Sequence, residues 1–204
     1  GVRFDVLRGF PYVVVHPGGA GIASSATTLT LQRSTNSVLA PPVPQNGDVI
    51  LIDGASTTRL IVQTATAGFV TGTPPVQNIS VSLQRPAGAA IPWTASAAKN
   101  ARLVRAAAYV VIPAGSRNEL RYYSSAEGVT NFATTVGYTL ILNNIGTATE
   151  DKTPFSLASV QGRNFLRTTL RVRSSQFDKR LQNKETNKFS TINRVQFLMN
   201  PRGT

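Results

Sequence analysis

The chain has 204 residues, with 21 Lys and Arg against 9 Asp and Glu, so its formal net charge is +12 at pH 7. It contains no cysteine and one histidine, which excludes disulfide scaffolds, cysteine proteases, cysteine-based zinc and iron–sulfur sites, and any metal site built on two histidines. Hydrophobic residues make up 41% of the chain and charged residues only 15%, so the basic character reflects a shortage of acids in a chain that can still bury a core.

Short runs rich in β-branched residues recur along the chain and predict a mainly β protein, because many of them alternate polar with apolar residues. In chain order, strands are expected at residues 12–15, 27–32, 48–53, 58–64, 78–84, 103–112, 118–123, 136–143, 166–173 and 193–199. Turn-forming sequences separate them, notably His-Pro-Gly-Gly at 16–19, Asp-Gly at 53–54, Pro-Ala-Gly-Ser at 113–116 and Asn-Asn-Ile-Gly at 143–146. We expect a single β-rich domain over residues 1–204, built as an antiparallel sheet or a β-sandwich.

Helix is expected at most over a short segment near residues 94–108, where alanine is frequent. The second half of this segment runs into Tyr-Val-Val-Ile, which favours extended structure. The proline-rich segments at 40–45 and 85–93 are predicted to be loops, since proline cannot donate a hydrogen bond to a sheet. No stretch has the roughly 18 consecutive apolar residues of a membrane-spanning helix.

The positive charge is concentrated in the last fifth of the chain, which we expect to form a basic C-terminal hairpin. Residues 163–204 carry ten basic and two acidic side chains, a net charge of +8, whereas the other 162 residues supply only +4. Strand alternation places Arg167, Arg171 and Arg173 on one face of the strand expected at 166–173. If the last strand pairs with this one, Arg194 joins the same row, and the polar segment 174–191 connects the two strands.

Two interpretations of this basic region stay open. One is an anion-binding stripe for a nucleic-acid backbone, because rows of Arg and Lys neutralise phosphates and release counterions. The other is a solvated sheet face that keeps the protein soluble and blunts a sheet edge. Tyr122 and Tyr123 are a weaker candidate for stacking single-stranded bases, because one tyrosine of such a pair normally faces the core. The candidate nucleic-acid-binding residues are Arg163, Arg167, Arg171, Arg173, Lys179, Arg180, Lys184, Lys188 and Arg194.

No catalytic or metal-binding constellation is recognisable in the sequence. The single histidine, His16, lies where a strand gives way to a turn, and a structural role is expected for it. Asn46, Asp48 and Asp53 are not spaced as in a calcium-binding loop, and the separation of the two aspartates places them on opposite faces of a strand. We therefore expect no enzyme activity, no cofactor and no metal, and a role as a binding or assembly protein.

Two parts of the chain resemble a known family. The first is AAAYVVIPAGSRNELRYYSS at 106–125, an apolar strand, a tight turn and a Leu-Arg-Tyr strand. The second is NFLRTTLRVRSS at 164–175 together with KFSTINRVQFLMNPRG at 188–203, a basic strand, a polar connection and a last strand that ends in Phe-Leu-Met-Asn. These segments are similar to the soluble heads of type IV minor pilins and of secretion-system pseudopilins.

The resemblance implies a non-enzymatic extracellular or cell-envelope subunit of a type IV pilus or pseudopilus, with other pilin or pseudopilin subunits as partners. It also implies that DNA or another polyanion binds the basic C-terminal hairpin during DNA uptake. The prepilin start Gly-Phe-Thr-Leu-x-Glu and the long apolar helix of the family do not occur in residues 1–204. The expected membrane attachment is therefore only through such a helix, outside these residues. The alternative is a β-sandwich subunit of a virion, a tail or a surface layer. A carbohydrate-binding module is disfavoured by the single tryptophan, Trp93.

Overall fold

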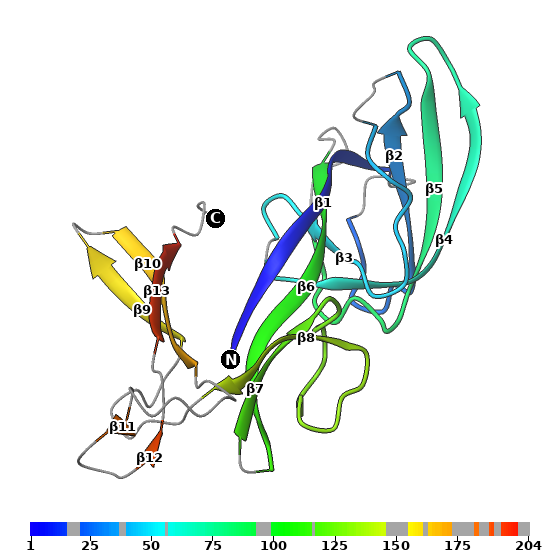
Figure 1. Cartoon of the computed structure of the whole chain (residues 1–204). Helices are drawn as coiled ribbons and strands as arrows, with labels where there is room; N and C mark the ends of the chain where they lie inside the picture. Colours follow the sequence, from blue (N-terminus) through cyan, green and yellow to red (C-terminus); the bar gives the residue numbers. More distant parts are fainter. Residues whose placement is uncertain are drawn as a thin grey trace. The chain divides into compact units, whose positions relative to one another are not determined.

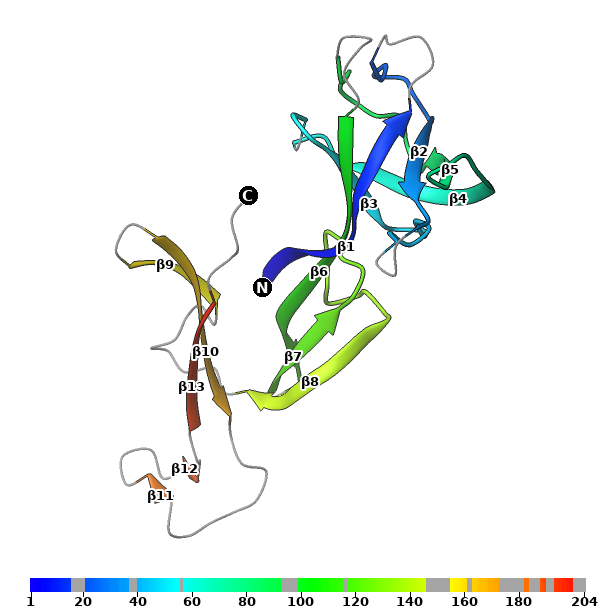
Figure 2. The ribbon, with the colours of Figure 1, turned by 90° about the horizontal axis from the view of Figure 1, so that it is seen from above.

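The structure is a computed structural model, and it describes residues 1–15, 21–36, 40–55, 57–92, 99–115, 117–145, 155–160, 163–172, 182–183, 188–189 and 193–199 (Figures 1 and 2). All regular elements within these residues are β-strands, which confirms the mainly β fold class expected from the sequence. The chain divides into two compact units, and each is described here by itself. The barrel unit is Phe4–Ala107, and the C-terminal unit is Gly1–Arg3 with Ala108–Thr204. The single domain expected over residues 1–204 stays a prediction.

Every strand expected from the sequence overlaps a strand of the structure. The strands are β1 (Val2–Val15), β2 (Thr28–Ser34), β3 (Val49–Ile52), β4 (Leu60–Thr71), β5 (Val76–Leu83), β6 (Lys99–Ala114), β7 (Arg117–Tyr123), β8 (Tyr138–Ile145), β9 (Phe155–Val160), β10 (Arg163–Val172), β11 (Gln182–Asn183), β12 (Lys188–Phe189) and β13 (Asn193–Met199).

The structure also corrects the expected boundaries. Residues 99–108 belong to β6, so the allowance for a short helix near 94–108 fails over this part, and residues 94–98 lie outside the described residues. The turn expected at 113–116 begins later, because Pro113 and Ala114 are still paired with β7. The turn expected at 143–146 is wrong as far as Ile145, which ends β8.

Six strands of the barrel unit pair in a closed ring. Their order is β1-β2-β5-β4-β3-β6, and β1 also pairs with β6. The pairs from β1–β2 through β3–β6 are all antiparallel. The strands β3, β4 and β5 follow one another, and β6 returns beside β3, which gives the spatial order of a Greek key. The unit is therefore an antiparallel sheet closed on itself, with strand β1 lying along β6 in both views (Figures 1 and 2).

Alternate residues of all six strands form one apolar core in the barrel unit. Ile22 and Ile91, which face each other across an isolated bridge, add to it. Because each strand turns every second side chain to the same face, a closed ring collects these side chains on its inside. The strand residues of this core are Tyr12, Val14, Leu29, Leu31, Ile50, Ile52, Leu60, Val62, Ile79, Val81, Leu83, Ala101 and Leu103.

Strand β3 is buried on both faces. Its residues Ile50 and Ile52 lie in the barrel core, while Val49 and Leu51 pack with Ile61 and Val104 in a second cluster. A continuous apolar run, Val-Ile-Leu-Ile, is the sequence expected for a strand covered on both sides.

The C-terminal unit contains two groups of antiparallel strands. The first is β6–β7–β8, in which β6 and β7 are paired from Ala108 opposite Tyr123 to Ala114 opposite Arg117. In the second, β10 lies between β9 and β13, because residues 166–168 pair with both of these strands. The two groups are joined where Val172 of β10 pairs with Ile145 of β8.

Candidate functional site

The basic C-terminal strands pair as the sequence predicts. β10 and β13 are antiparallel, in register from Leu166 opposite Met199 to Val172 opposite Asn193. Arg171 is directly opposite Arg194 in this register. Direct opposition in an antiparallel pair brings the backbones of two residues close together across the strands, and the arginine row itself stays a prediction.

Two further candidate arginines lie on β10 itself. Arg163 begins the strand opposite Val160 of β9, and Arg167 is opposite Ser156 of β9. Arg167 is half-buried, and its Nε atom is covered and has no hydrogen-bond partner among the described residues.

The remaining candidate residues are only partly described. Lys188 begins β12 and is opposite Asn183 of β11. The other four lie outside the described residues: Arg173, Lys179, Arg180 and Lys184. Of the nine candidate nucleic-acid-binding residues, the structure therefore brings together Arg171 and Arg194 and places Arg163 and Arg167 on the same strand. Binding of nucleic acid by these residues stays a prediction.

The tyrosine pair 122–123 is divided between two environments. Tyr123 is buried, its hydroxyl donates to the carbonyl oxygen of Phe132 at 2.7 Å, and its ring packs against that of Phe132. Tyr122 is partly exposed, and its ring lies 5.0 Å from the ring of Tyr109. One tyrosine faces the core, as expected, and its ring is not free to stack a base.

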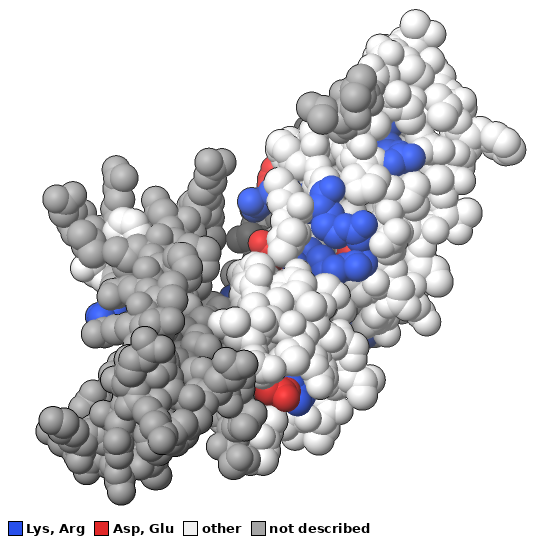
Figure 3. All heavy atoms as spheres, in the orientation of Figure 1, with Lys and Arg blue, Asp and Glu red and all other residues white. Residues whose placement is uncertain are grey.

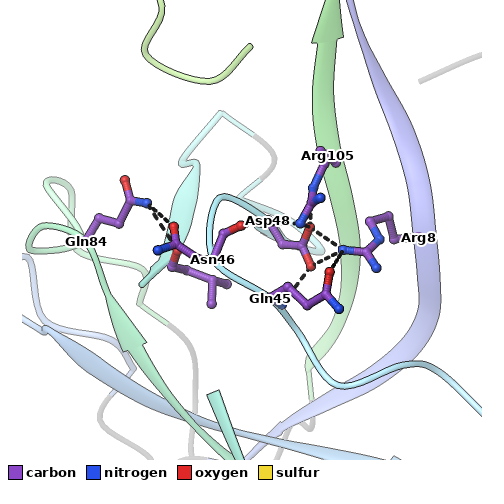
Figure 4. A network of polar contacts seen from close by, with 7 residues as sticks. Arg8, Gln45, Asn46, Asp48, Gln84 and Arg105 are labelled. Atoms are coloured by element: carbon purple, nitrogen blue, oxygen red, sulfur yellow. Dashed lines mark hydrogen bonds and ion pairs between the residues drawn. The ribbon is translucent and has the colours of Figure 1, made fainter. Parts of the chain in front are cut away.

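A buried charged cluster that the sequence did not reveal lies in the barrel unit (Figure 4). The carboxylate of Asp48 is fully buried, and Arg8 on β1 donates to both of its oxygens at 2.7 Å. Arg105 on β6 donates from Nε to Oδ1 at 2.8 Å, and the backbone amide of Gln45 donates to Oδ2 at 2.8 Å. Both arginine side chains point at Asp48 and keep about a quarter of their surface exposed.

This cluster ties three parts of the barrel unit together. It connects β1, β6 and the loop before β3, where Arg105 also donates to the carbonyl oxygen of Asn46 at 3.3 Å. The side chain of Gln84 extends the network by donating to Oδ1 of Asn46 at 3.0 Å. Two arginines against one buried carboxylate leave a local excess of one positive charge, directed toward solvent through the exposed parts of the guanidinium groups.

The geometry of Asp48 and Asp53 disfavours calcium binding by these two carboxylates. Both oxygens of Asp48 are occupied by arginine and amide donors, and two adjacent guanidinium groups would repel a cation. Asp53 is half-exposed and lies 3.8 Å from Nε of Arg102, away from this cluster. Among the described residues, no group of three or more His, Cys, Asp and Glu side chains could hold a metal ion. The histidine His16 lies outside the described residues.

One sequence signal for the cluster does exist. Asp48 stands directly before an all-apolar strand in a chain with only nine acids. A carboxylate in such a position is buried with β3, and buried carboxylates are almost always paired. The signal does not identify Arg8 and Arg105 as the partners, because these residues lie 40 and 57 positions away.

Tyr12 is a second buried titratable group among the described residues of the barrel unit. It is fully buried, and its hydroxyl donates to the carbonyl oxygen of Pro42 at 2.5 Å. Burial raises the pKa of Tyr12 from 10.0 to about 12, because the charged phenolate is poorly solvated there. In the C-terminal unit, the hydrogen bond to Glu119 raises the pKa of Arg121, whose guanidinium also lies 4.0 Å from the ring centre of Tyr138.

Among the described residues, large apolar side chains are exposed in three segments. Phe4, Val6, Leu7 and Phe10 of β1 form the first. Phe69, which is 93% exposed, and Val70 form the second, on β4. The third includes Val136 and the β8 residues Tyr138, Leu140 and Ile141. Single exposed apolar residues are ordinary, but several along one strand are typical of surfaces that contact another molecule.

Comparisons with known proteins give no match to this chain among protein-family models, curated protein sequences or solved structures. Within the described residues, no helix is long and apolar enough to span a membrane.

Proposed function

We propose that this chain is a non-enzymatic, minor pilin-like extracellular subunit of a type IV pilus or pseudopilus. The observation that carries the proposal is that both family-like segments form antiparallel strand pairs. The segment at 106–125 contains the β6–β7 hairpin, and the segments at 164–175 and 188–203 contain the paired strands β10 and β13. The exposed apolar residues of β1 and β8 support the same proposal, since subunits of a filament bury such side chains against their neighbours.

The reading frame upstream of Gly1 tests this proposal. A prepilin cleavage sequence, Gly-Phe-Thr-Leu-x-Glu, followed by an apolar helix of about 20 residues is the expected result. A start codon close to Gly1 with no apolar segment between would contradict the pilin-like assignment. Immunogold electron microscopy of cells that express the full protein provides the second measurement, with label expected on surface filaments or at their base.

Within this role, the basic C-terminal strands bind DNA or another polyanion. The support is the net charge of +8 over residues 163–204 together with the pairing of Arg171 and Arg194. About five phosphate contacts would give a slope of about −4 to −5 for log K against log salt concentration. A flat salt dependence, or no binding at low salt, would contradict this role.

Substitution of Arg167, Arg171 and Arg173 by glutamine should weaken DNA binding and reduce the salt slope by about 3. The matched control removes the same charge from the barrel unit by substituting Arg85, Lys99 and Arg102. Equal losses for the two variants would show that net charge alone, and not this strand, determines binding. Circular dichroism of both variants checks that the fold is retained.

A second candidate is a structural subunit of a virion, a tail or a surface layer. The observation that favours it is the closed ring of the barrel unit, which encloses its own apolar core with β-strands alone among the described residues. This candidate requires that purified residues 1–204 form ordered assemblies without any added segment. Negative-stain electron microscopy of the purified chain over a range of salt concentrations distinguishes the two candidates.

A further inference from the structure

The outer part of strand β4, residues 63–71, has an edge to which no described strand is hydrogen-bonded. Its pairing with β3 is confined to Leu60 and Ile61, and the loop before β3 adds backbone hydrogen bonds only as far as Val62. The opposite edge of β4 is paired with β5 as far as Thr71. Over residues 63–71, β4 therefore presents one paired edge and one edge whose N–H and C=O groups have no strand partner among the described residues.

This edge carries neither charge nor proline, two of the features with which proteins usually protect an exposed strand. All residues from 63 to 71 are exposed except Ala65, which is half-buried. None of them is charged or a proline, and residues 60–84, the whole β4–β5 hairpin, contain no Asp, Glu, Lys or Arg. The outer part of this hairpin is correspondingly free of blue and red atoms in Figure 3. Unpaired backbone N–H and C=O groups without nearby charge can pair with a further strand, and the threonines of this edge favour extended structure.

A β-bulge divides the free edge into two parts. Ala67 is paired with Ile79 and Val70 with Gln77, so Gly68 and Phe69 together face Asn78. The bulge is held in place by Gln77, whose Nε2 donates to the carbonyl oxygen of Gly68 at 2.7 Å. Bulges interrupt regular pairing and redirect side chains, so Phe69 projects into solvent. A second register shift lies between Val62 and Thr64, so residues 63–67 lie between the two irregularities and the regularly paired residues among them are 64–67.

The charge distribution makes this edge the place where a second copy of this chain can approach most easily. Two copies that each carry a net charge of +12 repel one another wherever their basic residues meet. The β4–β5 hairpin is the longest uncharged run of the sequence, and it is where two copies can approach without placing like charges opposite each other. Antiparallel pairing of the segment Gln-Thr-Ala-Thr-Ala with itself would also set threonine near threonine, which is a favourable cross-strand pair.

We propose that residues 63–67 of β4 pair with the same residues of a second copy, as antiparallel strands related by a two-fold axis. The strands β2, β5 and β4 of the two copies then form one continuous sheet, and Phe69 of each copy lies beside the junction. This interface does not depend on the pilin-like role or on DNA binding, so its test is separate from theirs.

Sedimentation velocity of the purified chain tests the interface, at concentrations up to about 1 mM, where dissociation constants in the millimolar range are measurable. The wild type is expected to form a dimer in a concentration-dependent manner. Thr66→Lys places two like charges at the junction and should raise the dissociation constant about tenfold or more. The matched control is Ser80→Lys, since Ser80 is exposed and directly opposite Thr66 but lies on β5, whose edges are both paired.

Cysteine cross-linking identifies the strand that occupies the edge. Because the chain has no cysteine, single cysteine variants at positions 63–67 report only on contacts between copies. A disulfide requires Cα atoms within about 7 Å, so one or two of these five variants, at the two-fold axis, should cross-link under mild oxidation.

Three results would overturn the proposal. The first is a monomer over the whole concentration range. The second is an equal effect of Thr66→Lys and Ser80→Lys, which would show that added charge and not the edge controls association. The third is a dimer that Thr66→Lys weakens but that no cysteine at 63–67 cross-links, which would show that β4 pairs with a different strand of the partner.

Discussion

Asp48 is the residue on which the electrostatics of the barrel unit depend most directly. Its buried carboxylate is bound by Arg8 and Arg105, two residues on the strands that close the ring. A buried ionic cluster of this kind often adds little net stability compared with apolar side chains in its place. Loss of one member, however, leaves the charges of the others buried without an opposite charge. Because Arg8 and Arg105 lie on β1 and β6, removing the charge of Asp48 tests whether these two strands close the ring as described.

Asp48→Asn should lower the free energy of unfolding by about 3 kcal/mol or more, because the two guanidinium groups lose their counter-charge. Asp53→Asn is the matched control, since Asp53 is half-exposed and only 3.8 Å from Nε of Arg102, and it should cost less than about 1 kcal/mol. Urea unfolding at neutral pH measures both. Similar small losses for the two variants would contradict the buried geometry of Asp48.

Because the pKa of Tyr12 is raised, the free energy of unfolding of the barrel unit should decrease at alkaline pH. Its folded-state pKa of about 12 lies above the ordinary value of 10.0, so folding favours the neutral phenol. This contribution is complete below pH 10 and is lost as the pH rises from 10 through 12, by about 2 to 3 kcal/mol in total.

Tyr12→Phe should therefore be less stable than the wild type by about 1 kcal/mol at pH 8, where it lacks the hydrogen bond to Pro42. The difference should shrink with rising pH and change sign near about pH 11, because phenylalanine does not ionise. Urea unfolding of both proteins between pH 8 and 11.5 measures this. A constant difference over the whole range would contradict the raised pKa.

At the level of elements, the two segments that meet at the isolated Ile22–Ile91 bridge are held together by backbone hydrogen bonds and lie very close to each other. Ile22 and Ile91 exchange two backbone hydrogen bonds, of 2.9 and 2.8 Å. Gly21 precedes this bridge with a φ of +78°, and a Cβ atom there would lie 2.4 Å from the carbonyl oxygen of Ile91. Gly88 has a similar φ of +83°, but a Cβ atom there would meet nothing within 4 Å.

Substitution of these two glycines distinguishes the cost of backbone strain, which both positions share, from the cost of a steric clash, which only Gly21 has. Gly88→Ala should cost about 1 to 2 kcal/mol, the usual cost of a left-handed conformation for a residue with a side chain. Gly21→Ala should cost at least about 2 kcal/mol more, because the backbone of Ile91 must also move. Denaturant unfolding gives both values, and equal costs would show that the bridge is not packed as described.

The sequence predicted the strands whose side chains alternate or are apolar throughout, such as Val-Ile-Leu-Ile of β3. It did not predict the first part of β1, where Arg3, Asp5 and Arg8 interrupt the pattern and the apolar residues between them are exposed. It also missed β9, whose Ser and Ala residues carry little β preference. The partners of Asp48 could not be predicted, because ring closure and not local sequence brings them together.

At the scale of the whole molecule, charge and β-structure are distributed unequally. The barrel unit contains the closed ring and its core, whereas most of the positive charge belongs to residues 163–204. The two proposed interactions therefore depend on salt in opposite ways. Salt weakens binding of a polyanion to the basic strands, whereas it screens the repulsion between two copies and strengthens pairing at β4.

A fragment of residues 4–107 should fold by itself, because all residues of the barrel core come from this range. We expect dispersed amide resonances in its two-dimensional NMR spectrum and a cooperative thermal transition. The full chain provides the reference spectrum. A fragment that stays unfolded would instead favour the single domain over residues 1–204 that the sequence predicts.

The closing pair of the ring also has a kinetic consequence. Strand β1 is the first strand of the barrel unit and β6 is the last, so the joint between them connects the two most distant segments of that unit. A nascent chain cannot complete the ring until β6 has left the ribosome, and long-range pairing of this kind makes folding slow, on the order of milliseconds to seconds. Until then Asp48 lacks Arg105, and the barrel core stays open to chaperones and proteases.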